Sequence, residues 1–150
     1  MKSVKIYLKK KKGCEDLPVP AYATSGSSGM DLYADVDGEA ILLPGDIKLI
    51  SSGIYVSIPE GYEAEIRPRS GLALKHGIGL VNAPGTIDSD YRGLLSIIMI
   101  NHGKRPFTIK RGDRIAQMVI KEVTRARIEV KSELDETGRA AGGFGHTGRR

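Results

Sequence analysis

Residues 94–100 read LLSIIMI, a run that is apolar at six of its seven positions. The run is far too short to cross a membrane and is typical of a β-strand whose two faces are both covered. Residues 115–123, IAQMVIKEV, and residues 126–130, ARIEV, are rich in β-branched side chains of the same kind, which also indicates strands. These three runs point to a fold built on β-strands.

Outward from these runs, shorter segments alternate apolar and polar residues, and period two predicts a strand with one buried face. These segments are 4–8, 54–58 and 62–66. Turn-forming sequences lie between the strands, at 44–46, 59–61, 84–85, 102–103 and 112–113. Many short strands at this spacing predict an all-β sandwich or barrel. One short helix is expected, with Ser70 as its N-cap and Gly77 at its end.

The composition of the chain further limits the kind of protein it can be. The 150 residues fit a single domain, and a 5% aromatic content without tryptophan predicts an aliphatic core. The one cysteine, Cys14, excludes an intramolecular disulfide and favours a reducing compartment. The charged first residues lack the apolar run of a signal peptide, and no stretch is long enough to span a membrane. We therefore expect a soluble cytoplasmic protein with no membrane partner.

The positive charge of the chain is concentrated at its start. The formal net charge is +5, and six lysines precede the first acidic residue. Without those six, the chain has 17 basic and 18 acidic residues and is close to neutral. We interpret the run Lys9–Lys12 as a solvated strand end, with a nucleic-acid-binding arm as the alternative. Nucleic acid is therefore an unlikely partner.

Four segments inside the body are too polar or too rich in glycine for their surroundings, namely 21–34, 67–77, 81–93 and 111–118. In the first, Asp31 stands where a strand is expected to begin. In the second, Arg69 precedes the expected helix, whose N-terminal N–H groups suit a phosphate. A capped helix with a surface arginine is the alternative. In the fourth, Gln117 falls inside an apolar strand, so its amide is either satisfied internally or faces a ligand.

The third segment, VNAPGTIDSDYRG, predicts a hairpin because it contains a Pro-Gly pair. Asn82 offers a donor and an acceptor on one flat amide. Asp88 and Asp90 place two carboxylates beside Tyr91. The segment is either a polar hairpin tip or a loop that could serve a planar ligand, a carboxylate base and an aromatic face together.

Apolar patterning fades from about residue 131, and residues 138–150 read GRAAGGFGHTGRR. Five glycines make this segment costly to order, which is typical of a frayed terminus. Its phenylalanine and arginines are also groups that bind ligands. Other familiar sites are missing from the sequence: the histidines have no cysteine partners for zinc, and there is no Walker loop and no Ser–His–Asp spacing.

Five motifs in order closely resemble the trimeric dUTP pyrophosphatase (dUTPase) family, over nearly the whole chain. They are AYATSGSSGMDLYA, PRSGLA, NAPGTIDSDYRG, RGDRIAQ and GGFGHTG. The resemblance implies a β-jelly-roll domain at 1–130 and an arm at 131–150 that closes over a neighbouring subunit's active site in a homotrimer. It also implies hydrolysis of dUTP to dUMP and pyrophosphate with Mg²⁺, by water attack on the α-phosphate.

The resemblance also assigns roles to residues. Asp88 is the implied catalytic base, and Asp31 is implied to contact Mg²⁺ through water. Implied phosphate-binding residues are Arg69, Ser70, Gly71, Gln117, Arg139 and Thr147. Implied uracil- and deoxyribose-binding residues are Asn82, Gly85, Thr86, Ile87, Tyr91 and Phe144.

The chain departs from the family pattern at Ala140, where many relatives have glycine, and at His146, where many have serine. Neither departure removes a group assigned above. Two other functions are weighed against dUTP hydrolysis. One is dCTP deaminase, which resembles dUTPase in fold and assembly and would release ammonia from dCTP. The other is a non-catalytic β-module that binds nucleic acid through its lysines.

Overall fold

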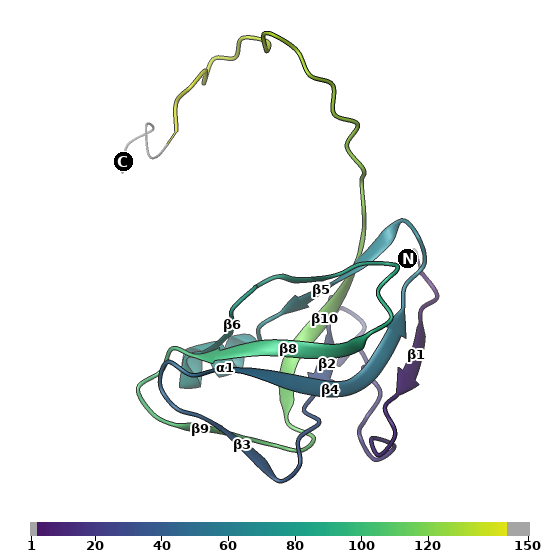
Figure 1. Cartoon of the computed structure of the whole chain (residues 1–150), viewed down its shortest axis with the longest axis vertical. Helices are drawn as coiled ribbons and strands as arrows, with labels where there is room; N and C mark the ends of the chain where they lie inside the picture. Colours follow the sequence, from purple (N-terminus) through teal and green to yellow (C-terminus); the bar gives the residue numbers. More distant parts are fainter. Residues whose placement is uncertain (1–2, 144–150) are drawn as a thin grey trace.

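The computed structural model describes residues 3–143, and two four-stranded antiparallel sheets make up most of the body (Figure 1). The first sheet contains, in spatial order, β1 (Tyr7–Lys10), β4 (Ile47–Ser57), β8 (Leu94–Asn101) and β6 (Ile78–Leu80). The second contains β2 (Met30–Tyr33), β10 (Arg114–Glu122), β5 (Tyr62–Arg67) and β7 (Gly85–Ile87). A third, two-stranded sheet pairs β3 (Glu39–Leu42) with β9 (Phe107–Lys110). The predicted all-β jelly-roll fold is confirmed.

The core is aliphatic, as composition predicts. Leu32, Leu95, Ile97, Met99 and Met118 are at most 1% exposed. Among the described residues no aromatic side chain is fully buried; Tyr62 and Phe107 only pack against the edge of this core. The core is therefore built by the alternating inward residues of strands from both sheets.

Strand β8 was expected to be covered on both faces, and within one chain that expectation is wrong. Its inward residues are buried, but Ile98 and Ile100 on the other face are only half-buried. Opposite them on β4 lie Leu49 and Ile47, which are 68% and 56% exposed. We call these four residues the outer apolar face. An exposed apolar face of this kind on a sheet is typical of an interaction surface.

Two further predictions are corrected by sheet pairing. The hairpin at 82–93 is not formed, because β6 pairs with β8 in the first sheet while β7 pairs with β5 in the second. Residues 81–84 instead carry the chain from one sheet to the other. The strand at 126–130 is also absent, and Ile128 and Val130 are 86% and 97% exposed. An isolated segment has no neighbouring strand to accept its backbone hydrogen bonds.

The first strand and the helix begin close to, but not at, the predicted residues. The first strand begins at Tyr7 rather than residue 4, because its partner β4 ends at Ser57, directly opposite Tyr7. The helix, α1 (Ser70–His76), has Arg69 as its N-cap rather than Ser70. Arg69 has extended backbone angles and makes no side-chain cap, because its guanidinium binds elsewhere. The C-cap at Gly77 is confirmed, in the left-handed conformation with φ of 70°.

A charged network fastens the loop after β1 to the body. Asp35, whose side chain is 5% exposed, accepts hydrogen bonds from Lys11 at 2.7 Å, Ser51 at 2.9 Å and Arg111 at 2.7 Å. Arg111 also pairs with Asp16 at 2.8 Å. Burial would raise the pKa of Asp35, but the hydrogen bonds from these cations and hydroxyl together hold that pKa well below its usual range. Lys11 is thus held by an ion pair within the fold, although 44% of its side chain stays exposed.

Other members of the N-terminal lysine run also contact the chain. Lys10 donates to the carbonyl oxygen of Glu15 at 2.9 Å, and the ammonium of Lys9 lies 5.7 Å from the centre of the Tyr55 ring. Lys9, Lys10 and Lys11 of the run therefore each contact another part of the chain.

No helix in residues 3–143 has the length and apolar character that crossing a membrane requires.

Candidate functional site

Asp88 follows the last residue of β7, at the start of a tight turn. The backbone N–H of Tyr91 donates to the Asp88 carbonyl oxygen at 3.1 Å. The Arg92 guanidinium then donates to the carbonyl oxygens of Ser89 at 2.7 Å and Tyr91 at 2.8 Å. These bonds fix the backbone of the turn and leave the Asp88 side chain exposed. The arrangement presents a carboxylate to a ligand from a rigid support.

Tyr91 is held within the same turn. Its hydroxyl donates to the Leu94 carbonyl oxygen at 3.1 Å, and 43% of the residue is exposed. One side of the ring lies against Gly93, where any side chain would collide with it. The turn thus brings together Asp88 and Tyr91, as the sequence predicts.

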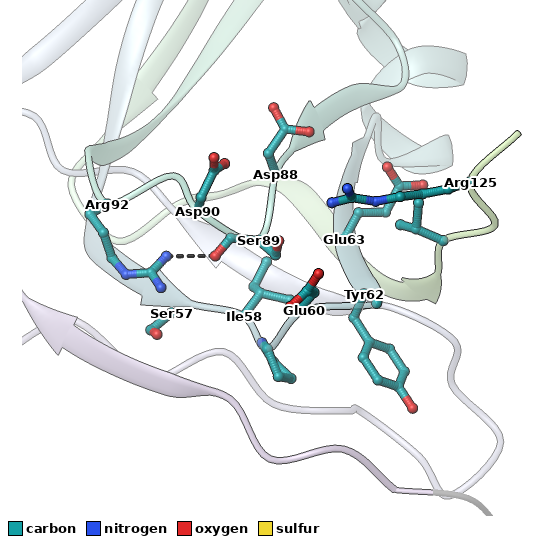
Figure 2. Close-up of a pocket in the computed structure, with 13 residues that line it drawn as sticks. Ser57, Ile58, Glu60, Tyr62, Glu63, Asp88, Ser89, Asp90, Arg92 and Arg125 are labelled. Carbon is teal, nitrogen blue, oxygen red and sulfur yellow. Dashed lines mark hydrogen bonds between the residues drawn. The ribbon is translucent and has the colours of Figure 1, made fainter. Parts of the chain in front are cut away.

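An open cavity of about 720 Å³ lies beside this turn (Figure 2). Asp88, Asp90 and Glu63 line it, and so does Arg125. Tyr62 lines the far end. The cavity is polar, and its position places Asp88 beside the first residues of β5.

A second cluster lies at the other end of the second sheet. Arg69 binds the Asp31 carboxylate through Nε at 3.0 Å and the Arg114 carbonyl oxygen through Nη1 at 3.1 Å. The Arg114 guanidinium binds the other Asp31 oxygen at 3.2 Å. Two guanidinium groups therefore converge on one carboxylate, and both remain partly exposed. Arginines with unused donors suit a phosphate.

Gln117 belongs to this cluster, because it pairs in register with Asp31 on β2 and with Arg67 on β5. Its amide donates to the Pro68 carbonyl oxygen at 3.0 Å, so its N–H group is satisfied internally. A shallow cavity of about 510 Å³ opens here, lined by Gln117, Pro68, and Ala83 and Pro84 of the crossing segment. The Gln117 side chain is half-buried and borders this cavity.

The first helical residues, Ser70 and Gly71, follow Arg69 directly and are exposed. The first turn of α1 contains no acidic residue, so no carboxylate competes for its N–H groups. Arg69, Ser70 and Gly71 thus form one continuous polar surface next to Asp31.

The predicted uracil-binding residues occupy the crossing segment and β7. Asn82 and Thr86 are exposed, Gly85 is buried and Ile87 is half-buried. A side-chain carbon at Gly85 would lie 3.2 Å from the Asn82 amide nitrogen, so the backbone here approaches that amide closely. Backbone groups and one amide are therefore available together for a planar base.

The C-terminal segment leaves the body after β10 and extends away from it (Figure 1). Residues 124–141 are exposed throughout, and Leu134 is 85% exposed. Arg139 donates to the Gly142 carbonyl oxygen at 2.8 Å, and Ala140 has a positive φ of 43° in this local turn. Arg139 makes no contact with the body of its own chain within the described residues. Phe144, His146 and Thr147 lie outside the described residues.

Asp88 and the Arg69 cluster are not brought together within one chain. Asp88 lies beside Glu63, whereas Gln117 pairs with Arg67, four residues further along β5. At about 3.3 Å per residue, that separation is about 13 Å of strand. None of Arg69, Ser70 and Gln117 lines the cavity beside Asp88. A single chain therefore presents two partial sites.

Sequence reasoning missed several charged groups near these sites. Arg114 was not singled out, although it lies three residues after Arg111 in the RGDRIAQ motif. Glu65 is 9% exposed, and hydrogen bonds from Lys121 at 2.8 Å and from Arg67 lower its pKa. Only folding brings Lys121 to Glu65, because the two are 56 positions apart.

The described residues contain no group of three or more histidine, cysteine or acidic side chains arranged to hold a metal ion. Both Asp31 oxygens are engaged by arginines.

The fold and these clusters define an all-β protein whose exposed carboxylate and arginine cluster suit a phosphorylated ligand with a planar base. A family model described as dUTPase matches residues 15–148. The deoxyuridine 5'-triphosphate nucleotidohydrolase of Caldanaerobacter subterraneus subsp. tengcongensis is 56% identical over 146 residues, which cover 97% of this chain and 99% of that protein. The chain belongs to the dUTPase family.

Solved structures agree on the fold. The Staphylococcus bacteriophage 80alpha dUTPase with dUPNHPP has a TM-score of 0.86 at 23% identity and covers 97% of this chain and 99% of its own. A mutant dUTPase from phage phi11 of S. aureus, described with a structural Mg(II) ion, has a TM-score of 0.76 at 22% identity. It covers 87% of this chain and 98% of its own.

Proposed function

We propose that this protein hydrolyses dUTP to dUMP and pyrophosphate, which limits uracil incorporation into DNA and supplies dUMP for thymidylate synthesis. Membership of the dUTPase family, with a relative of that activity 56% identical over nearly the whole chain, supports the reaction. The observation that carries the mechanism is the exposed Asp88 carboxylate on its braced turn.

In the proposed reaction, Asp88 accepts a proton from a water molecule, whose oxygen forms a bond to the α-phosphorus. The bond from that phosphorus to the bridging oxygen breaks, and pyrophosphate leaves in line with the attack. Catalysis of this kind depends on positioning and charge stabilisation more than on covalent chemistry. The rigid turn under Asp88 serves the first need, and Arg69 with Gln117 serves the second.

The phosphates are proposed to bind Arg69, Ser70, Gly71 and Gln117. These residues form a continuous surface with a convergent guanidinium and free backbone donors. Arg139 and Thr147 on the arm are proposed to complete the γ-phosphate contacts. Arg139 supports this role because its guanidinium is exposed and its only side-chain bond among described residues is local.

Mg²⁺ is proposed to be held chiefly by the triphosphate and water, with Asp31 contacting the water molecules. Asp31 fits this role because its carboxylate is partly exposed and each oxygen, engaged by one arginine, can still accept a hydrogen bond from a water molecule. When bound, the ion neutralises charge on the phosphate oxygens. Arg69 keeps Asp31 oriented beside the phosphate surface.

Uracil is proposed to lie against the backbone of Gly85, Thr86 and Ile87, with the Asn82 amide pairing at its edge. Backbone pressed against the C5 edge leaves no room for the thymine methyl group. Cytosine would place a donor where uracil has an acceptor, and a buried mismatch costs more than a lost contact. Tyr91 is proposed to pack against the deoxyribose, and Phe144 to stack on the base.

The active site is proposed to be shared between subunits of a homotrimer. Three observations support assembly: the separation of Asp88 from Arg69 in one chain, the exposed outer apolar face, and the extension of the arm, as far as residue 143, away from its own body. A neighbouring chain would supply the missing phosphate cluster, and the arm would cover a neighbour's site. Sedimentation should therefore show a trimer.

The test is a pyrophosphate-release assay with dUTP, dTTP, dCTP and UTP in the presence of Mg²⁺. We expect turnover of dUTP alone, with no ammonia from dCTP. Asp88→Asn should leave nucleotide binding largely intact and lower kcat by several orders of magnitude, whereas Asp90→Asn in the same turn should retain most activity. Near-normal turnover by Asp88→Asn would contradict the role of Asp88, and ammonia from dCTP would favour a deaminase.

A further inference from the structure

We propose that Gly93 is a positioning residue for Tyr91, and that the absence of a side chain at position 93 sets the selectivity of the enzyme for deoxyribose. The inference deepens the proposed function and rests on it, because Tyr91 is the residue proposed to pack against the sugar.

The contact between Gly93 and Tyr91 is unusually close. A Cβ atom at position 93 would lie 2.2 Å from the Tyr91 hydroxyl oxygen and 2.4 Å from ring carbon Cζ. Ordinary contact begins at 3.4 Å. The end of the tyrosine ring therefore occupies the volume that any other residue at 93 would need.

Backbone conformation does not explain this glycine. Seven glycines of the described chain have positive φ, the region that favours glycine, and Gly93 is not among them. At Gly93, the absent side chain provides space rather than backbone freedom. That space is filled by Tyr91 and by no other residue among its nearest contacts.

An added methyl group would displace the ring rather than the backbone. The turn is bonded on both sides, from Tyr91 N–H to the Asp88 carbonyl and from Arg92 to the Ser89 carbonyl. The Tyr91 residue, by contrast, is 43% exposed, and within residues 3–143 its hydroxyl is held only by the bond to the Leu94 carbonyl. The hydroxyl end would have to retreat by about 1 Å to reach ordinary contact, and that tether would break.

A shift of this size is comparable in scale with the single oxygen by which the two sugars differ. Deoxyribose and ribose differ by one oxygen at C2′, and a pocket rejects an extra group by leaving it no room. If Tyr91 forms the wall beside C2′, a ring displaced by 1 Å or more opens that wall. The recognition of uracil at Asn82 and β7 involves other residues and should be unaffected.

The experiment measures kcat/KM for dUTP, UTP and dTTP in four proteins: wild type, Gly93→Ala, Tyr91→Phe and Gly26→Ala. Gly26 is a matched control, since a Cβ there would contact nothing within 4 Å. In Gly93→Ala we expect the dUTP-to-UTP ratio to fall at least tenfold while the dUTP-to-dTTP ratio stays within threefold. Gly26→Ala should keep both ratios. An unchanged dUTP-to-UTP ratio, or an equal fall in both ratios, would overturn the proposal.

A double-mutant cycle tests whether Gly93 acts through Tyr91. Tyr91→Ala alone should lower the dUTP-to-UTP ratio, and adding Gly93→Ala to it should change the ratio less than twofold. If the effects of the two substitutions on the dUTP-to-UTP ratio multiply in the double variant, the proposal is contradicted. Tyr91→Phe adds no atom and removes only the hydroxyl that bonds to the Leu94 carbonyl. It should lower the dUTP-to-UTP ratio severalfold, even if Gly93→Ala fails to assemble. An unchanged ratio in Tyr91→Phe would count against a ring held by its hydroxyl.

Wild-type protein that does not hydrolyse dUTP would overturn the proposed function itself, and is thus a separate outcome.

Discussion

Replacing Asp35 by asparagine should destabilise the protein through the charged network that fastens the loop after β1. Asp35 is the centre of that network, with Lys11 and Arg111 each 2.7 Å from one of its oxygens. Its side chain is 5% exposed, whereas those of Lys11 and Arg111 are 44% and 29% exposed. Asparagine keeps the shape of the side chain but removes the charge, and it turns one acceptor into a donor that faces cations.

The expected loss follows from these exposures. Breaking a fully buried ion pair by removing one partner costs about 3–5 kcal/mol. Here the two cations can still reach water, and Arg111 keeps Asp16 as a partner, so we expect about 2–3 kcal/mol, no more than the lower end of that range. With a urea m-value of about 2 kcal/mol per molar for a small domain, the midpoint should fall by about 1–1.5 M.

The loss should depend on pH in a defined direction. The pKa of Asp35 is lower in the folded protein than its usual value, so folding favours the charged carboxylate. Its contribution is then fully present above the unfolded-state pKa of about 3.9 and is lost as pH falls below that value. The difference in unfolding free energy between wild type and Asp35→Asn should be constant from pH 7 to about pH 5 and should shrink below about pH 4.

Urea unfolding at a fixed protomer concentration measures both effects, because the stability of an oligomer depends on concentration. Asp37→Asn is the matched control, since Asp37 is exposed and has no ion pair within the described residues. A loss below about 1 kcal/mol at pH 7, or a difference between the proteins that grows in acid, would refute the reasoning.

Three other predictions concern assembly, reactivity and the arm. Leu49→Asp places a charge on the outer apolar face and should convert a trimer to monomers in sedimentation; a stable trimer would show that this face is not an interface. Burial, and to a lesser extent a hydrogen bond to Asp35, raises the pKa of Cys14. A thiol reagent should therefore label native protein at least 100-fold more slowly than unfolded protein. Equal labelling rates would contradict the burial of this thiol. Deletion of residues 138–150 should leave a folded trimer with turnover reduced at least 100-fold, whereas full activity would show that the segment is only a frayed end.

The sequence predicts the strands of this fold where a local pattern dominates. Alternation at 54–58 and 62–66 identifies parts of β4 and β5, because one face of each strand must be buried against the core. The run at 94–100 identifies β8 by its continuous apolar character, although only one face of β8 is buried within one chain. Local pattern says little about pairing, and the predicted hairpin at 82–93 failed because a Pro-Gly pair marks a change of direction without specifying which sheet the chain enters.

In the candidate site, too, the sequence predicts local arrangements but not long-range pairs. Asp88 and Tyr91 are three residues apart and share one turn, so sequence places them together. The bond from Arg111 to Asp35 joins residues 76 positions apart, and no local signal reveals it. The same holds for Arg114, whose partner Asp31 is 83 positions away. Long-range ion pairs follow from the register of strands, which the sequence alone does not define.

The division of the site within one chain has a consequence for how activity is controlled. Asp88 lies beside the first residues of β5, and the Arg69 cluster lies beside its last residues. Because β5 is a rigid strand, it cannot bend to bring the two together. In the proposed trimer, a chain that has not assembled thus holds a base without its phosphate surface. Dissociation should then abolish turnover without unfolding the sandwich, and activity per protomer should fall with dilution in parallel with the loss of trimer. In the proposed trimer, assembly would thus be part of the catalytic apparatus, because contact between chains would place the phosphate surface of one chain against Asp88 of another.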